Sequence, residues 1–66
     1  MHIYVNGKDT EITDGLTLAS LIAKKGFVPG TVVVEHNLVI QPKEKWAQIV
    51  LMPEDKIEII RIIGGG

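Results

Sequence analysis

The chain is 66 residues long, and a chain of about this length buries only about 60% of the surface that its unfolded form exposes. Apolar residues make up 45% of the sequence and charged residues 23%, a composition typical of a folded protein. We therefore expect one small domain. It has little room for the enclosed pocket that a self-sufficient enzyme requires, so a non-enzymatic role is expected.

Charge and cysteine content exclude several further classes of function. The net charge is −1, so binding to nucleic acid or to an anionic membrane is not expected. Cysteine is absent, which excludes disulfides, thiolate metal sites and a cysteine nucleophile and suits a reducing compartment. The sequence shows no secretion signal and no apolar run of the roughly 18 residues that cross a bilayer. We expect a cytoplasmic protein that is monomeric when free.

The first predicted element is a β-hairpin. Apolar residues alternate with others over residues 2–5, and Asn6-Gly7 readily adopts the positive φ angles of a type I′ turn. The following strand, residues 8–12, is polar and is expected at the edge of a sheet. Asp14-Gly15 should end this strand.

Residues 16–26 predict a short amphipathic helix. Thr17 is a suitable N-cap, and Gly26 suits the position just beyond the last turn. Apolar side chains at helical spacing are expected in the core, namely Leu18, Leu21 and Ile22, with Phe27 beside them.

The second half of the chain predicts strands separated by turns. Pro29-Gly30 indicates a loop, and the β-branched residues 31–35 indicate a central strand. A short strand is expected over residues 38–40. Pro42 should then open a helical turn that ends at Trp46, whose indole is expected to anchor the turn on the domain.

Two strands are predicted near the end of the chain. The first is a small strand over residues 49–51, followed by a turn at residues 53–55. The second covers residues 56–63, is the most apolar of all, and leads directly into Gly64-Gly65-Gly66. No repeat or linker interrupts this order.

Together these elements predict a two-layer α+β domain, in which one main helix covers one face of a mixed sheet of four to five strands. This order resembles the β-grasp, or ubiquitin-like, fold. We expect the folded domain to comprise residues 1–63 and a flexible glycine tail to comprise residues 64–66. The run Arg61-Ile62-Ile63-Gly64-Gly65-Gly66 resembles the diglycine terminus of ubiquitin-like proteins and bacterial sulfur carriers.

Within that superfamily the chain resembles the ThiS family, the sulfur carriers of thiamine biosynthesis. The matching features are the Asn6-Gly7 opening, the helix around residues 18–22, the stretch Val39-Ile40-Gln41-Pro42-Lys43-Glu44-Lys45-Trp46 and the terminal glycines. The spacing between Pro42 and Trp46 is the most discriminating of these features. A third terminal glycine departs slightly from a minimal diglycine end.

The resemblance implies a covalent role for Gly66. A ThiF-like adenylating enzyme would use ATP to adenylate the Gly66 carboxylate, and a persulfide donor would convert it to a thiocarboxylate. Thiazole synthase, the ThiG-like partner, would then accept the sulfur. No tightly bound cofactor is expected. Because glycine has no Cβ, Gly64, Gly65 and Gly66 form a thin thread of about 10 Å that a narrow partner channel can admit.

Other interpretations of the glycine tail remain open at this point. The chain also resembles the small subunits of molybdopterin synthase in fold and tail, although these are typically longer and the stretch from Pro42 to Trp46 is not a known feature of them. A protein-conjugated modifier or a purely structural domain would share the same fold. Terminal glycines alone are also typical of a disordered end or of an expression remnant.

The last strand predicts a docking surface beside the tail. Alternation places Ile57, Ile59 and Arg61 on one face and Ile60 and Ile62 on the other. One helix covers one face only, so Ile60 and Ile62, with the adjacent Arg61, are predicted to contact partners. The alternative is a strand that is buried on both sides.

The remaining polar residues carry weaker predictions. His2 and His36 have no evident carboxylate partner and are expected at exposed or strand-edge positions, and no metal site or acid–base pair is predicted. Glu54-Asp55 is interpreted as an ordinary solvated turn. Four basic side chains are candidates for recognition of an acidic partner surface, namely Lys8, Lys43, Lys45 and Arg61.

Overall fold

The structure, a computed structural model of the chain, describes residues 1–62. Its elements in chain order are β1 (His2–Val5), β2 (Lys8–Glu11), α1 (Leu18–Lys24), the 3₁₀ helix η1 (Pro29–Thr31), β3 (Val32–His36), β4 (Val39–Gln41), the 3₁₀ helix η2 (Lys43–Gln48) and β5 (Lys56–Arg61). The strands form one mixed sheet in the order β2-β1-β5-β3-β4. The predicted α+β architecture, with five strands and one main helix, is confirmed.

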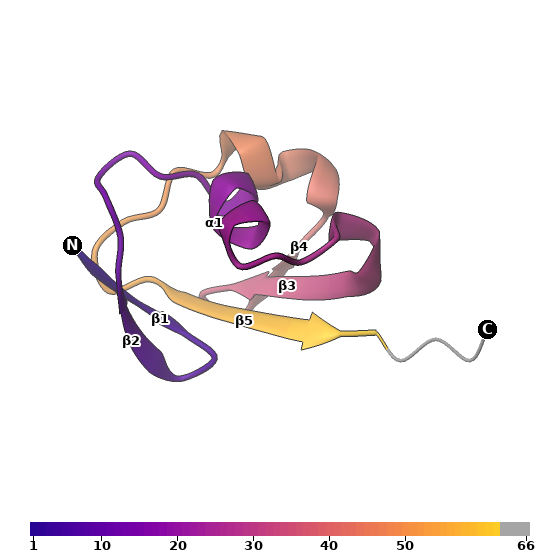
Figure 1. Cartoon of the computed structure of the whole chain (residues 1–66), viewed down its shortest axis with the longest axis horizontal. Coiled ribbons are helices and arrows are strands. Elements are labelled where there is room, and N and C mark those ends of the chain that lie inside the picture. The colour runs from indigo at the N-terminus through magenta and orange to yellow at the C-terminus, as the bar shows by residue number, and fades with distance from the viewer. Residues whose placement is uncertain (63–66) are drawn as a thin grey trace.

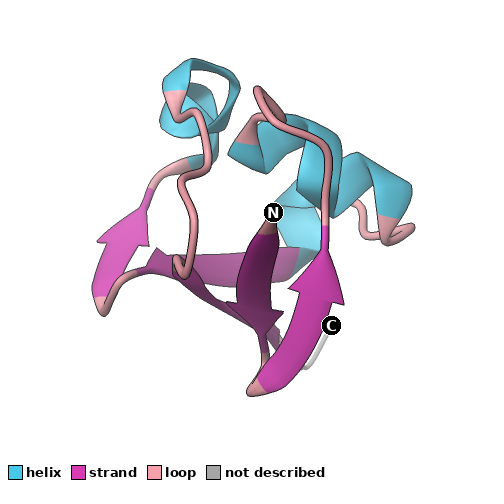
Figure 2. Ribbon diagram, turned by 90° about the vertical axis from the view of Figure 1, so that its left-hand side faces the viewer, coloured by secondary structure: helices cyan, strands magenta, loops and turns pink. Residues whose placement is uncertain are grey.

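The helices lie on one side of this sheet (Figures 1 and 2). β5 is the central strand, and it pairs in parallel with β1 and antiparallel with β3. Side chains from the covered face and from α1 form the core, and η2 contributes an indole. The core residues are Ile3, Val5, Leu18, Leu21, Ile22, Val32, Val34, Trp46, Leu51, Ile57 and Ile59.

The opening hairpin forms as predicted and also fixes β5. Asn6 and Gly7 both have positive φ, as the type I′ turn requires. The backbone N–H of Asn6 donates to the carbonyl of Ile57 at 2.9 Å, and its side-chain Oδ1 accepts from the N–H of Ile59 at 2.8 Å. The turn therefore extends the pairing of β1 with β5 beyond the end of β1.

Helix α1 lies between the predicted caps, with Lys24 as its last residue and Lys25 as its C-cap. Thr17 is the N-cap, and its Oγ1 accepts a hydrogen bond from the backbone N–H of Ser20 at 3.2 Å. Gly26, with φ +83°, lies just beyond the C-terminal end as expected. Leu16 stays outside the helix because its carbonyl accepts a hydrogen bond from the N–H of Leu51.

Two local predictions near the turns are wrong. Residues 49–51 do not form a strand, because their pairing is limited to a single bridge between Thr17 and Val50. Pro29-Gly30 belongs to the short helix η1 rather than to an irregular loop.

The Pro42 turn is confirmed, and it continues as η2 to Gln48. Trp46 is 3% exposed and donates from Nε1 to the carbonyl of Gln41 at 2.8 Å, which confirms its role as an anchor.

Candidate functional site: the end of the central strand

β5 carries the chain from the middle of the sheet to the start of the glycine tail. Beyond the last strand residue, the backbone N–H of Ile62 donates to the carbonyl of Thr31 at 2.9 Å. This bond holds the chain beside η1 at the point where the domain ends (Figure 1). Gly66, the residue predicted to carry the sulfur, and the predicted tail Gly64-Gly65-Gly66 lie outside the described residues.

The two faces of β5 differ as the alternation predicted. Ile57 and Ile59 are buried under the helices, whereas Ile60 is 48% exposed and Ile62 is 51% exposed. No helix within residues 1–62 covers the second face (Figure 2). The alternative of a strand buried on both sides is therefore excluded for β5.

Ile60 lies on a sheet face where several strands present apolar side chains. Val33 lies directly opposite Ile60 on β3, and Ile40 on β4 lies opposite Glu35, the next residue of β3 on the same face. Tyr4 on β1 shares this face and is partly exposed. We call Tyr4, Val33, Ile40 and Ile60 the open sheet face. These apolar side chains share the face with Glu35, Glu58 and Lys56, so the surface is mixed in character. Its contact with a partner stays a prediction.

Arg61 does not belong to the open sheet face. Its guanidinium carbon lies 5.5 Å from the centroid of the Phe27 ring, on the side where α1 ends. Among residues 1–62, no carboxylate lies within ion-pair distance of Arg61. The three predicted docking residues therefore occupy two different surfaces. Ile60 lies on the open sheet face, whereas Ile62, which follows the last residue of β5, lines a hollow together with Arg61.

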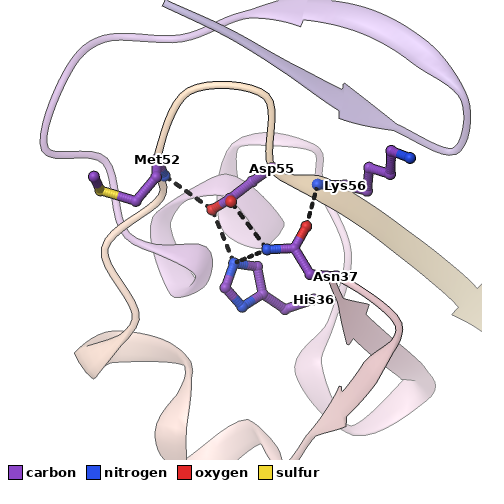
Figure 3. A network of polar contacts seen from close by, with 5 residues as sticks. All are labelled: His36, Asn37, Met52, Asp55 and Lys56. Carbon is purple, nitrogen blue, oxygen red and sulfur yellow. Dashed lines mark hydrogen bonds and ion pairs between the residues drawn. The ribbon is translucent and has the colours of Figure 1, made fainter.

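The interpretation of His36 and Asp55 as ordinary exposed residues is wrong. His36 Nε2 lies 2.8 Å from Asp55 Oδ2, and Asp55 is only 7% exposed (Figure 3). Asn37 Nδ2 donates to Asp55 Oδ1 at 3.0 Å, and the backbone N–H of Met52 donates to Asp55 Oδ2 at 2.9 Å. Asn37 Oδ1 in turn accepts from the backbone N–H of Lys56 at 2.8 Å. This network joins the turn between β3 and β4 to the first residue of β5.

The same contacts determine the ionisation of Asp55. Burial alone would raise the pKa of this carboxyl group, because it disfavours the charged form. The hydrogen bonds from Asn37, Met52 and His36 favour the carboxylate and outweigh burial, so the pKa of Asp55 is lowered. Asp55 is therefore an ionised carboxylate at neutral pH whose role is to fix the start of β5.

His2 also has a carboxylate partner that the sequence did not reveal. Its Nδ1 lies 2.7 Å from Asp9 Oδ1 across the opening hairpin, where both side chains are exposed. Within residues 1–62 no group of three or more potential ligands could hold a metal ion. None of the helices in this part of the chain is long and apolar enough to cross a membrane.

The described architecture, with the opening hairpin, one main helix and a central strand that leads to the chain end, defines a small β-grasp protein of the ubiquitin-like class. The profile of the ThiS family matches residues 3–66. The Bacillus subtilis sulfur carrier protein ThiS is 35% identical over 65 residues, which cover 97% of this chain and 98% of that protein. The chain belongs to the ThiS family.

Three further comparisons describe proteins to which the chain is similar. The crystal structure of the thiamine biosynthesis protein ThiS from Geobacter metallireducens superposes with a TM-score of 0.84 at 28% identity, with 100% of both chains covered. The thiazole synthase of Paramagnetospirillum magneticum is 36% identical over 66 residues. The match covers 100% of this chain but only 20% of that enzyme. A similar match to the thiazole synthase of Magnetococcus marinus also spans 20% of the enzyme.

Proposed function

We propose that this chain carries sulfur on the carboxyl group of Gly66 for the formation of the thiazole ring in thiamine biosynthesis. The main support is the family match, which extends through the terminal glycines to residue 66. The fold agrees with this role, because β5 is the central strand and leads directly toward those glycines.

The first step of the proposed cycle is activation of the tail. The Gly66 carboxylate is ionised at neutral pH, since the ordinary pKa of an α-carboxyl group is about 3.3–3.7. Held in a ThiF-like enzyme, it attacks the α-phosphate of ATP and displaces pyrophosphate. The product is an acyl-adenylate, in which the carbonyl carbon is open to nucleophilic attack. ATP belongs to the partner enzyme and not to this chain.

The second step loads the sulfur. The terminal sulfur of a persulfide donor attacks the activated carbonyl and displaces AMP, and a thiol then cleaves the sulfur–sulfur bond and leaves a thiocarboxylate on Gly66. Thiazole synthase, a ThiG-like enzyme, receives the sulfur and returns the chain with a carboxylate. In this cycle the chain is a cytoplasmic co-substrate rather than an enzyme, and partner enzymes supply the catalytic groups.

Intact mass spectrometry tests this proposal. Incubation of the chain with ATP, a ThiF-like enzyme and a persulfide donor should increase its mass by about 16 Da, because sulfur replaces oxygen in a covalent modification.

A variant that lacks Gly65 and Gly66 should gain no mass and yet unfold at the same temperature, because terminal residues contribute little to a packed core. Gly65→Val should also impair loading, because a β-branched residue widens and stiffens the thread. A known ThiS protein incubated in parallel provides the control. The proposal would be contradicted if that protein gained mass and the wild-type chain did not.

A further inference from the structure

A hollow of about 400 Å³ lies beside the point where the chain leaves the domain. It is lined by Gly26, Phe27, Val28, Thr31, Arg61 and Ile62. These residues come from the segment between α1 and η1, from the end of η1, and from the last residue of β5 with the residue that follows it. We call this feature the exit hollow. It is separate from the open sheet face, because it lies on the helix side of β5 where Arg61 contacts Phe27.

Two of the side chains that line the exit hollow are apolar and accessible. Val28 is 63% exposed and Ile62 is 51% exposed, whereas the buried side chains of β5 are at most 7% exposed. The backbone around them is held in place, because Ile62 N–H donates to the Thr31 carbonyl and Phe27 N–H donates to the Ile22 carbonyl. An apolar side chain of a partner could therefore be buried here at little cost in ordering this chain.

A cation is fixed at the edge of the same hollow. Arg61 shares the strand face of Ile57 and Ile59 but lies beyond the core, where its guanidinium rests near the Phe27 ring. A guanidinium that stacks on an aromatic ring keeps its N–H donors free at the ring edge for a planar acceptor. No carboxylate of residues 1–62 pairs with these donors.

The surrounding charge is also positive, although the whole chain has a net charge of −1. Residues 16–34, which include α1 and η1, contain Lys24 and Lys25 but no acidic residue. Lys43 adds a third ammonium group, because its Nζ lies 4.0 Å from the Cβ position of Gly30. This end of the molecule is therefore complementary to an acidic protein surface.

We propose that the exit hollow receives the rim of the channel through which the adenylating enzyme takes the glycine tail. The rim would present a carboxylate to the guanidinium of Arg61 and an apolar side chain to Val28 and Ile62. This inference rests on the proposed function, because an enzyme that draws Gly66 into a narrow channel must place the channel entrance against the residues around the chain exit. Arg61 is then a recognition residue and takes no part in the chemistry.

The test compares three variants of the full chain in an adenylation assay that measures pyrophosphate release by a ThiF-like enzyme. Arg61→Gln removes the cation, and its apparent KM should rise about tenfold or more, because hydrogen bonds to charged groups are the stronger class. The kcat should stay within about twofold of the wild-type value, because a lost recognition contact affects ground state and transition state alike. Arg61→Lys keeps the charge but loses the planar guanidinium with its paired N–H donors. Its KM should therefore lie between those of the wild type and Arg61→Gln.

Lys56→Gln is the matched control, because it removes the same charge from an exposed side chain at the opposite end of β5 from Arg61. Its KM should stay near the wild-type value. Equal KM increases for Lys56→Gln and Arg61→Gln would show general electrostatic attraction and overturn the specific contact. A wild-type KM for Arg61→Gln would also overturn the inference while leaving the proposed function intact. Absence of adenylation in the wild type would instead contradict the proposed function itself. Thermal unfolding of each variant shows whether a KM change reflects a folding defect.

Discussion

Asp55 shows how one side chain fixes the strand that leads to the tail. Its carboxylate accepts from the Asn37 side chain and from the Met52 backbone, and it also contacts His36 (Figure 3). Asn37 completes the connection through its bond to the N–H of Lys56, the first residue of β5. In the part of the chain that the structure describes, no buried side-chain polar atom lacks a hydrogen-bond partner. Removal of the carboxylate would therefore leave several donors without their acceptor.

Asp55→Asn should lower the free energy of unfolding at pH 7 by about 1–3 kcal/mol, the range for a buried polar group that loses its partner. Because the folded protein has the lower pKa at Asp55, this carboxylate stabilises the fold above the unfolded pKa of about 4. The contribution is lost as the pH falls through the folded pKa. Urea unfolding at several pH values should therefore show a difference between wild type and variant that is constant at pH 5–7 and shrinks below about pH 4.

Asp14→Asn provides the control, because the Asp14 side chain is 90% exposed. This variant should differ little from the wild type throughout the pH range, since exposed ion pairs contribute little to stability. A difference for Asp55→Asn that persists undiminished at the lowest pH would show that the carboxylate charge is not what stabilises the network.

At the scale of the element, the two faces of β5 separate stability from binding. Ile59→Ala removes a side chain that is 7% exposed and packs in the core. It should lower the free energy of unfolding by about 2–5 kcal/mol, a large fraction of the stability of a small domain. Ile60→Asp changes a residue that is 48% exposed on the open sheet face, so the cost to the free fold should be within about 1 kcal/mol.

Ile60→Asp should instead weaken the complex with the adenylating enzyme or thiazole synthase, because binding would bury a charge without a partner. Chemical unfolding and titration calorimetry on both variants would measure the two effects. Normal binding by a folded Ile60→Asp variant would remove the open sheet face as a docking surface. If the Ile60→Asp variant were unfolded and the Ile59→Ala variant as stable as the wild type, the burial seen in the structure would be contradicted.

Local sequence signals predicted most of the elements. The Asn6-Gly7 turn, the Thr17 cap and the alternation of β5 depend on neighbouring residues, so their geometry could be inferred from a few positions along the chain. The strand predicted at residues 49–51 failed because short apolar runs do not determine their pairing. In the fold, the carbonyl of Ile49 accepts from the N–H of Leu18 at the start of α1, and the N–H of Leu51 donates to the carbonyl of Leu16.

The features that the sequence did not predict depend on contacts between distant positions. His36 and Asp55 are 19 residues apart, and Asn6 and Ile59 are 53 residues apart. Arg61 was predicted to contact partners, but its stacking on Phe27 and its separation from Ile60 follow from how α1 ends over the sheet. The role of Gly66 came from the resemblance to a family and lies outside the described residues, so it stays a prediction.

At the scale of the whole molecule, the contacts of the described residues converge on β5. The core, the hairpin turn and the Asp55 network all fix this strand, and the proposed reaction takes place on the residues that follow it. Under the proposed function, partner enzymes bind the folded domain and act on the tail. The two proposed surfaces, the open sheet face and the exit hollow, lie on opposite sides of β5.

The most direct test of the account is a single-turnover transfer of sulfur. The chain would be loaded as a thiocarboxylate with a heavy sulfur isotope, purified, and mixed with a ThiG-like thiazole synthase and its other substrates. The account predicts that the isotope appears in the thiazole product and that the chain returns to its unloaded mass as the carboxylate re-forms on Gly66. Formation of thiazole without the isotope would contradict the account. So would a thiocarboxylate that stays unchanged when the same enzyme accepts sulfur from a known ThiS protein in a parallel reaction.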